Sequence, residues 1–86
     1  MANQKKVMDI HEGRTHLSVI RSNTDRINPY RIYLVISPTG SPLRQRLLIK
    51  YGDFMSCIYF IRDFFLEGLD TMCYTEMVEK IRSWQG

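Results

Sequence analysis

Residues 30–51, YRIYLVISPTGSPLRQRLLIKY, decide the fold, because they contain two strands and the turn that joins them. In residues 30–37 every second side chain is apolar, which is the period of a strand with one buried face. This apolar set is Tyr30, Ile32, Leu34 and Ile36. Residues 38–42, PTGSP, predict a turn, since Gly tolerates a positive φ and Pro fixes φ at about −65°. Residues 43–51 follow as a second strand, so the segment predicts an antiparallel β-hairpin.

The period of the apolar residues changes directly after this hairpin. Asp53 is a suitable N-cap, because its carboxylate can accept a hydrogen bond from a free N–H of a first helical turn. The pattern predicts a helix from Phe54 to about Glu67, with Gly68 at the position where helices often end in a left-handed residue. Its apolar residues cover well over half of the circumference: Phe54, Cys57, Ile58, Phe60, Ile61, Phe64 and Phe65. A helix that lies only on a sheet needs a narrower apolar face, so we expect additional cover for this one.

Three further segments complete the predicted order of elements. A second helix is expected over residues 71–84, capped by Asp70 or Thr71, with an amphipathic stripe of Met77, Val78, Ile81 and Trp84. Residues 15–22 predict a strand from their β-branched and apolar composition. Residues 1–13 are polar and show no sustained periodicity, so a short strand, a helical turn and disorder all stay open for them.

The sequence therefore predicts an α+β fold, with a three-stranded antiparallel sheet followed by two helices (β-β-β-α-α) and the first helix largely buried. We expect a polar N-terminal arm, residues 1–13, and a single domain, residues 14–86, since a chain of 86 residues encloses one core. The order of elements resembles half of the fold of Whirly-type single-stranded-DNA-binding proteins, whose helices mediate dimerisation. It is also similar to the three-stranded arm-binding domains of some recombinases. Both resemblances concern topology, and no residue role follows from them.

The composition is that of a folded globular domain, with 44% hydrophobic and 24% charged residues. The first residues lack the apolar run of a signal peptide. The longest apolar stretch, residues 54–66, is shorter than the about 20 residues that span a bilayer. We therefore expect a cytoplasmic protein with no membrane partner. In that compartment Cys57 and Cys73, both within apolar segments, are expected to be reduced and buried.

The charges are divided unevenly between the two halves of the chain. Residues 14–51 contain seven basic residues and one acid, a net charge of +6. Residues 52–86 contain three basic residues and six acids, a net charge of −3, and residues 1–13 sum to zero. The predicted sheet is therefore basic and the predicted helices are acidic.

The alternation within the strands places the basic residues on one face of the sheet. If Ile32 and Leu47 face the helices, the residues of opposite parity face away from them and share one surface. Cationic side chains around a tyrosine suit single-stranded nucleic acid, because guanidinium groups contact phosphates and a base can stack on the ring. The sequence thus predicts a nucleic-acid-binding sheet, with single strands slightly preferred over duplex. The expected contact residues are Arg31, Tyr33, Arg44, Arg46 and Lys50, together with Arg21.

Other functions remain open at this level. The exposed face of an antiparallel sheet is ordinarily polar, so the basic residues also fit a merely solvated surface. A protein-interaction or dimerisation module with no nucleic-acid role is the first alternative. Whichever function holds, we expect a second copy of the chain as a partner, in a homodimer through residues 54–67 and 71–84. A small ribonuclease is the second alternative, with His11 and His16 as acid and base and Arg44 or Arg46 holding the phosphate.

Neither a catalytic residue nor a cofactor is assigned from the sequence. His11 and His16 lack a third or fourth ligand at the spacing of a metal site, because both cysteines lie more than forty residues downstream. The glycines are isolated, so no phosphate-binding loop of a standard type is present. No metal and no cofactor are expected.

Overall fold

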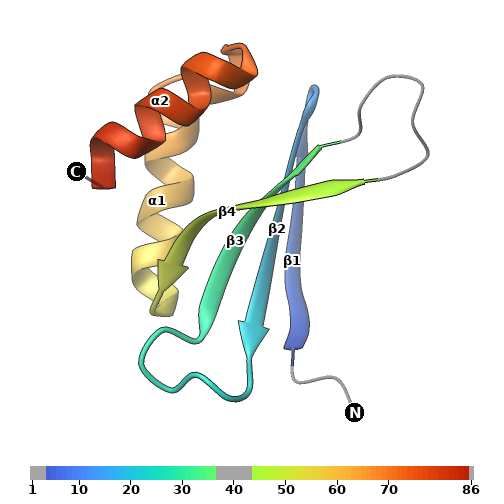
Figure 1. Cartoon of the computed structure of the whole chain (residues 1–86), viewed down its shortest axis with the longest axis vertical. Helices are drawn as coiled ribbons and strands as arrows, with labels where there is room; N and C mark the ends of the chain where they lie inside the picture. Colours follow the sequence, from blue (N-terminus) through green and yellow to red (C-terminus); the bar gives the residue numbers. More distant parts are fainter. Residues whose placement is uncertain (1–3, 37–43, 86) are drawn as a thin grey trace.

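The structure of the chain is a computed structural model that describes residues 4–36 and 44–85. Within these residues four strands precede two helices. The elements are β1 (Gln4–Glu12), β2 (Thr15–Ser22), β3 (Tyr30–Ile36), β4 (Gln45–Gly52), α1 (Phe54–Leu66), a 3₁₀ turn (Leu69–Thr71) and α2 (Tyr74–Gln85). The strands form one antiparallel sheet in the order β1-β2-β3-β4, and both helices lie on one side of it (Figure 1). The expected α+β class is confirmed.

The expected number of three strands is wrong, because part of the predicted arm forms a fourth strand. β1 pairs with β2 along its whole length, from Gln4 opposite Ser22 to Glu12 opposite Thr15. The tight connection begins with Gly13 at a φ of +59°, as two-residue hairpin turns with a leading glycine require. A bulge between Lys6 and Met8 interrupts the alternation of β1. Its strand character therefore comes from pairing with β2 and is weak in its own sequence.

The predicted hairpin is present as β3 and β4. Arg31 pairs with Tyr51, and Ile36 pairs with Gln45. The predicted turn, residues 38–42, and the expected strand ends at Ser37 and Leu43 lie outside the described residues. A bulge on β4 follows Leu48, and its effect on side-chain direction matters for the binding surface described below.

The core lies between the sheet and α1. Its fully buried side chains are Leu17, Ile32, Cys57, Phe64 and Leu69. Around them pack further buried residues of the strands and of both helices: Val19, Leu34, Ile49, Phe60, Met77 and Ile81. α2 covers one flank of α1, where Phe60 meets Trp84 with 5.5 Å between ring centroids. Only three residues of α1 are buried, so the burial of this helix is narrower than the sequence predicts.

The N-cap of α1 is confirmed and the cap of α2 is not. The Asp53 carboxylate accepts a hydrogen bond from the Ser56 backbone N–H at 2.7 Å, and Gly68 has a φ of +73°. Asp70 and Thr71, the expected caps of α2, lie instead in the 3₁₀ turn. The hydroxyl of Thr71 donates to the Gly68 carbonyl oxygen at 2.7 Å, which closes that turn. α2 begins only at Tyr74, after the chain has turned over the fully buried Leu69.

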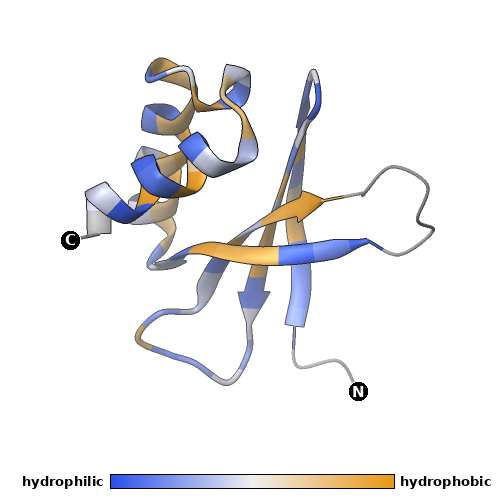
Figure 2. Cartoon of the chain, turned by 45° about the horizontal axis from the view of Figure 1, so that its top comes forward, coloured by the Kyte–Doolittle hydropathy of each residue, from blue (hydrophilic) through white to orange (hydrophobic). Residues whose placement is uncertain are grey.

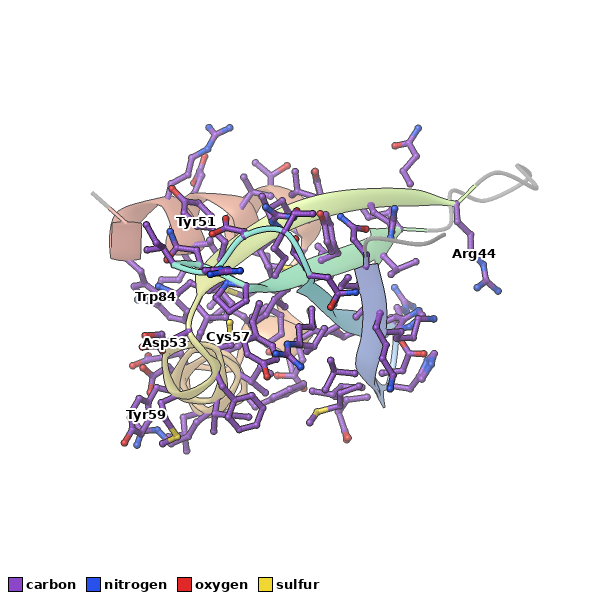
Figure 3. All side chains as sticks on the ribbon, turned by 90° about the horizontal axis from the view of Figure 1, so that it is seen from below. Arg44, Tyr51, Asp53, Cys57, Tyr59 and Trp84 are labelled. Atoms are coloured by element: carbon purple, nitrogen blue, oxygen red, sulfur yellow. The ribbon has the colours of Figure 1, made fainter. Side chains whose placement is uncertain are left out.

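The two cysteines differ in environment, and the expectation that both are buried is wrong for Cys73. Figure 3 shows Cys57 pointing from α1 toward the sheet, where its Sγ lies 3.9 Å from the Tyr30 carbonyl oxygen. Cys73 precedes α2 and is exposed. Burial raises the pKa of the Cys57 thiol, so this group stays protonated at neutral pH. None of the helices among the described residues has the length and apolarity needed to cross a membrane.

We expect a thiol reagent to label one cysteine quickly and the other slowly. In the native protein Cys73 reacts at once, whereas Cys57 reacts only when the fold opens. Mass spectrometry after timed labelling measures both rates, and Cys73→Ser removes only the fast phase. Equally fast native labelling of both thiols would contradict the packing of α1 on the sheet.

Candidate nucleic-acid interface

No described helix packs on the face of the sheet that points away from α1 and α2 (Figure 1). Its β2 residues Ser18 and Ile20 are only 3% and 5% exposed, so the accessible part of this face lies mainly on β1, β3 and β4. The members of the face follow from the register, because directly paired residues of antiparallel strands share a face. Tyr33 pairs with Ser18 on one side and with Leu48 on the other, and Ser18 pairs with Asp9. Since the neighbouring Ile32 is buried against the helices, this row points outward.

Two further rows flank the central one. The first of these rows lies next to the central row, on the side of the β1–β2 turn. In it His11 pairs with His16, and Val35 pairs with Arg46. On the other side Ile20 pairs with Arg31, which pairs in turn with Tyr51. We call the surface made by these three rows the open face. Its residues are Asp9, His11, His16, Ser18, Ile20, Arg31, Tyr33, Val35, Arg46, Leu48 and Tyr51, with Lys6 at its margin beside Ile20.

The centre of the open face is an aromatic ring beneath a guanidinium group. Arg46 lies over Tyr33, with 5.0 Å from the guanidinium carbon to the ring centroid. This contact is a cation–π interaction, and it holds an otherwise flexible side chain against the sheet. Among the described residues no acid forms an ion pair with Arg46. The pair therefore offers a flat surface and an uncompensated positive charge at one point.

Arg31 and Arg44 are placed differently from Arg46. The guanidinium of Arg31 lies 3.5 Å from a carboxylate oxygen of Asp25, so an acid of the β2–β3 connection partly neutralises it. That carboxylate also accepts hydrogen bonds from the backbone N–H groups of Ile27 and Asn28, which fixes its position. Arg44 is exposed at the start of β4, at the end of the sheet farthest from the helices (Figure 3). Figure 2 shows the same end of β4 in hydrophilic colours and the middle of the strand in hydrophobic ones.

Lys50 does not lie on the open face, so the expected placement of this residue is wrong. Ile32 pairs with Lys50, whereas Tyr33 pairs with Leu48, which makes Ile49 the additional residue of a bulge. A bulge of one residue reverses the face of every side chain beyond it. Lys50 therefore lines a hollow of about 460 Å³ on the helix side, together with Ser56, Phe60, Trp84 and other helix residues. The same reversal brings Tyr51 to the open face, which the sequence analysis did not predict.

Arg21 is also separated from the predicted cluster. It pairs with Tyr30 and therefore points to the helix side, although it is exposed at the end of β2. Of the six expected contact residues, Arg31, Tyr33 and Arg46 share the open face, and Arg44 stands at its end. Arg21 and Lys50 do not belong to it.

β1 and the start of β2 add a group of polar side chains that the sequence analysis did not place on the predicted binding surface. The Asp9 carboxylate accepts hydrogen bonds from His16 Nε2 at 3.0 Å and from Lys6 Nζ at 3.1 Å. The His16 and His11 rings are stacked, with 3.9 Å between their centroids. The hydrogen bond from His16, followed by that from Lys6, lowers the pKa of Asp9 below its ordinary value. The alternation of Met8 and Ile10 with Asp9 and His11 is the signal that could have revealed this strand.

The histidine pair offers neither a metal site nor an evident acid–base pair. No group of three potential ligands for a metal stands together in residues 4–36 and 44–85. The stacked imidazoles are in contact, so no phosphate fits between them as it would between a general base and a general acid. The alternative of a small ribonuclease therefore gains no support from this geometry.

Comparisons with known proteins add no functional assignment. No protein-family model, no curated protein and no solved structure matches the chain. The topological resemblance to single-stranded-DNA-binding folds thus has no matching protein behind it, and the functional argument rests on the geometry of the open face.

We expect the Asp9 carboxyl to titrate below the usual range of aspartate. The ionised form then stabilises the fold above the ordinary pKa, and this contribution is lost as the pH falls through the lowered value. His16→Ala should raise the pKa of Asp9 further than Lys6→Ala does, because His16 is the larger cause of the shift. Carbon-detected NMR of the side-chain carboxyl measures the titration. An ordinary pKa in the wild type would show that β1 does not pair with β2 in this register.

Proposed function

We propose that the protein binds single-stranded nucleic acid on the open face. The observation that carries the proposal is the Tyr33–Arg46 pair on the face of the sheet that the helices leave free. A base can stack on the guanidinium plane or on the ring, and the arginine can contact the adjacent phosphate. Neither contact depends on the identity of the base, so we expect weak sequence preference.

The composition of the open face favours single strands over duplex. Tyr33 and Val35 are half-buried, and Leu48 is exposed, so the part of the surface on β3 and β4 contains an apolar patch. A duplex presents phosphates on its outside and would cover this apolar patch without using it. The unstacked bases of a single strand can pack on the patch directly.

The electrostatic part of the proposed binding is modest. Lys6 and Arg31 are engaged with Asp9 and Asp25. Arg46, and Arg44 directly before β4, form no ion pair among the described residues. Two unpaired arginines predict few phosphate contacts and hence a shallow dependence of affinity on salt.

A protein-interaction role without nucleic acid is the second candidate. It is supported by the exposed apolar side chains of α1, among which Met55 is 51% and Leu66 75% exposed. α2 offers no comparable surface, since Glu76, Glu79 and Arg82 are exposed on it. Of the two helices expected to mediate a homodimer, α1 therefore presents most of the exposed apolar residues, and Tyr74 at the start of α2 is 49% exposed.

Alanine variants of basic residues at different places on the sheet distinguish binding by the open face from attraction by the net charge of the protein. Arg44→Ala and Arg46→Ala should each lower the slope of log affinity against log salt by about 0.7 for a single strand, the value for one lost phosphate contact. The measurement is fluorescence anisotropy with a labelled oligonucleotide over a salt series.

Arg21→Ala and Lys50→Ala are the matched controls, because they remove the same charge from the helix side. We expect both to leave affinity and slope almost unchanged. Equal losses in all four variants would mean that net charge alone drives the binding. Absence of salt-dependent affinity in the wild type for both DNA and RNA would refute the proposed function.

Stacking on Tyr33 is tested separately from charge. Tyr33→Ala should weaken binding by about 1–3 kcal/mol without changing the salt slope, whereas Tyr33→Phe should retain most of the affinity. Tyr59→Ala, which removes an exposed ring from α1, is the control. Thermal unfolding confirms that each variant is folded. Unchanged affinity of Tyr33→Ala would place the nucleic acid elsewhere.

A further inference from the structure

β1 is an edge strand of the sheet, with a free outer edge among the described residues. β2 is the only element with extensive contacts to β1, and Figure 1 shows β1 on the side of the sheet away from α1 and α2. Eight of its nine residues are exposed, the exception being the half-buried Ile10. A strand of this length has unpaired N–H and C=O groups along its outer edge, and such an edge readily pairs with another strand.

The charges of β1 are segregated along the strand. Lys5 and Lys6 stand in its first half, and Asp9 and Glu12 in its second half. Two copies of such a strand attract each other when they run antiparallel, because the basic half of one then lies beside the acidic half of the other.

One register satisfies both the charges and the faces of β1. With the pairing centred between Val7 and Met8, Lys6 lies opposite the partner's Asp9, and both belong to the open face. In the same register Lys5 lies opposite the partner's Ile10, and both point to the helix side. The bulge of β1 falls at the centre of this pairing. There Val7 of each copy, which is 44% exposed, lies opposite Met8 of the other, which is 36% exposed.

The opposite edge of the sheet does not offer the same pairing. β4 contains Arg46 and Lys50 and no acid, so two copies of it would repel each other. Its Leu47 and Ile49 also line a hollow with Val78 and Ile81 of α2, so a helix stands beside this strand. Pairing of β1 with β4 of another copy would leave a free edge at each end and continue into a filament.

We propose that the protein forms a two-fold homodimer by antiparallel pairing of β1 with β1 of a second copy. The pairing joins the two sheets into one of eight strands with all helices on the same side. The two open faces then form one surface, on which the Tyr33 side chains stand five inter-strand spacings apart, roughly 24 Å across the sheet. The interface is independent of the helix-mediated dimer expected from the sequence, since it uses neither α1 nor α2.

Charge reversal within β1 tests this interface. Light scattering at tens of micromolar should give twice the chain mass of 10.2 kDa for the wild type. Lys6→Glu and Asp9→Lys should each be monomeric, because each places like charges opposite one another in both cross-strand pairs. An equimolar mixture of the two variants should recover the dimer, since each Glu or Asp then faces a Lys of the other chain.

The mixture separates pairing between copies from the Lys6–Asp9 ion pair within one copy. Residues 6 and 9 of a variant carry like charges whether it is alone or mixed, so only contacts between chains respond to mixing. Glu76→Lys, a charge reversal on the exposed side of α2, is the matched control and should remain dimeric. A monomeric wild type would overturn the proposal. So would a mixture no more dimeric than its components, or a dimer that Met55→Glu on α1 dissociates while the β1 variants do not.

Discussion

One-sided burial is the constraint from which the rest of the structure follows. Phe64 and Cys57 of α1 are completely buried, and they pack on Leu17 and Ile32 in the middle of the sheet. Both helices follow the last strand, and both lie on that same side (Figure 1). The other side must then be stable in contact with water, and it is: its larger apolar residues are interleaved with Arg46, Arg31 and polar side chains of β1. The open face is thus a consequence of how the core is built.

The bulge on β4 decides which charged residues reach that face. Without it, Lys50 would stand beside Arg31 and the open face would be more basic. With it, Lys50 points to the helices, where it lowers the pKa of Asp53, although less than the Ser56 N–H does. The open face therefore includes Tyr51 in place of Lys50. The surface that results is richer in rings than in unpaired charges, which favours stacking over phosphate attraction as the source of affinity.

Local patterns predicted the elements well and predicted the surface only in part. The alternation in residues 30–37, the Asp53 cap and the position of Gly68 are properties of a few neighbouring residues, and the structure confirms each. β1 was missed because its bulge breaks the alternation and β2 supplies its stability. Lys50 was misplaced because a bulge depends on pairing with another strand. The His16–Asp9 contact follows from the β1–β2 register, which the sequence alone does not show.

The central claim, that the open face carries the binding surface, is tested most directly by NMR titration of the labelled protein with a single-stranded oligonucleotide. The account predicts amide and side-chain shift changes at Tyr33, Arg46, Leu48 and His16, with α1 and α2 little affected. Shift changes confined to the helices, or none with any DNA or RNA, would contradict it.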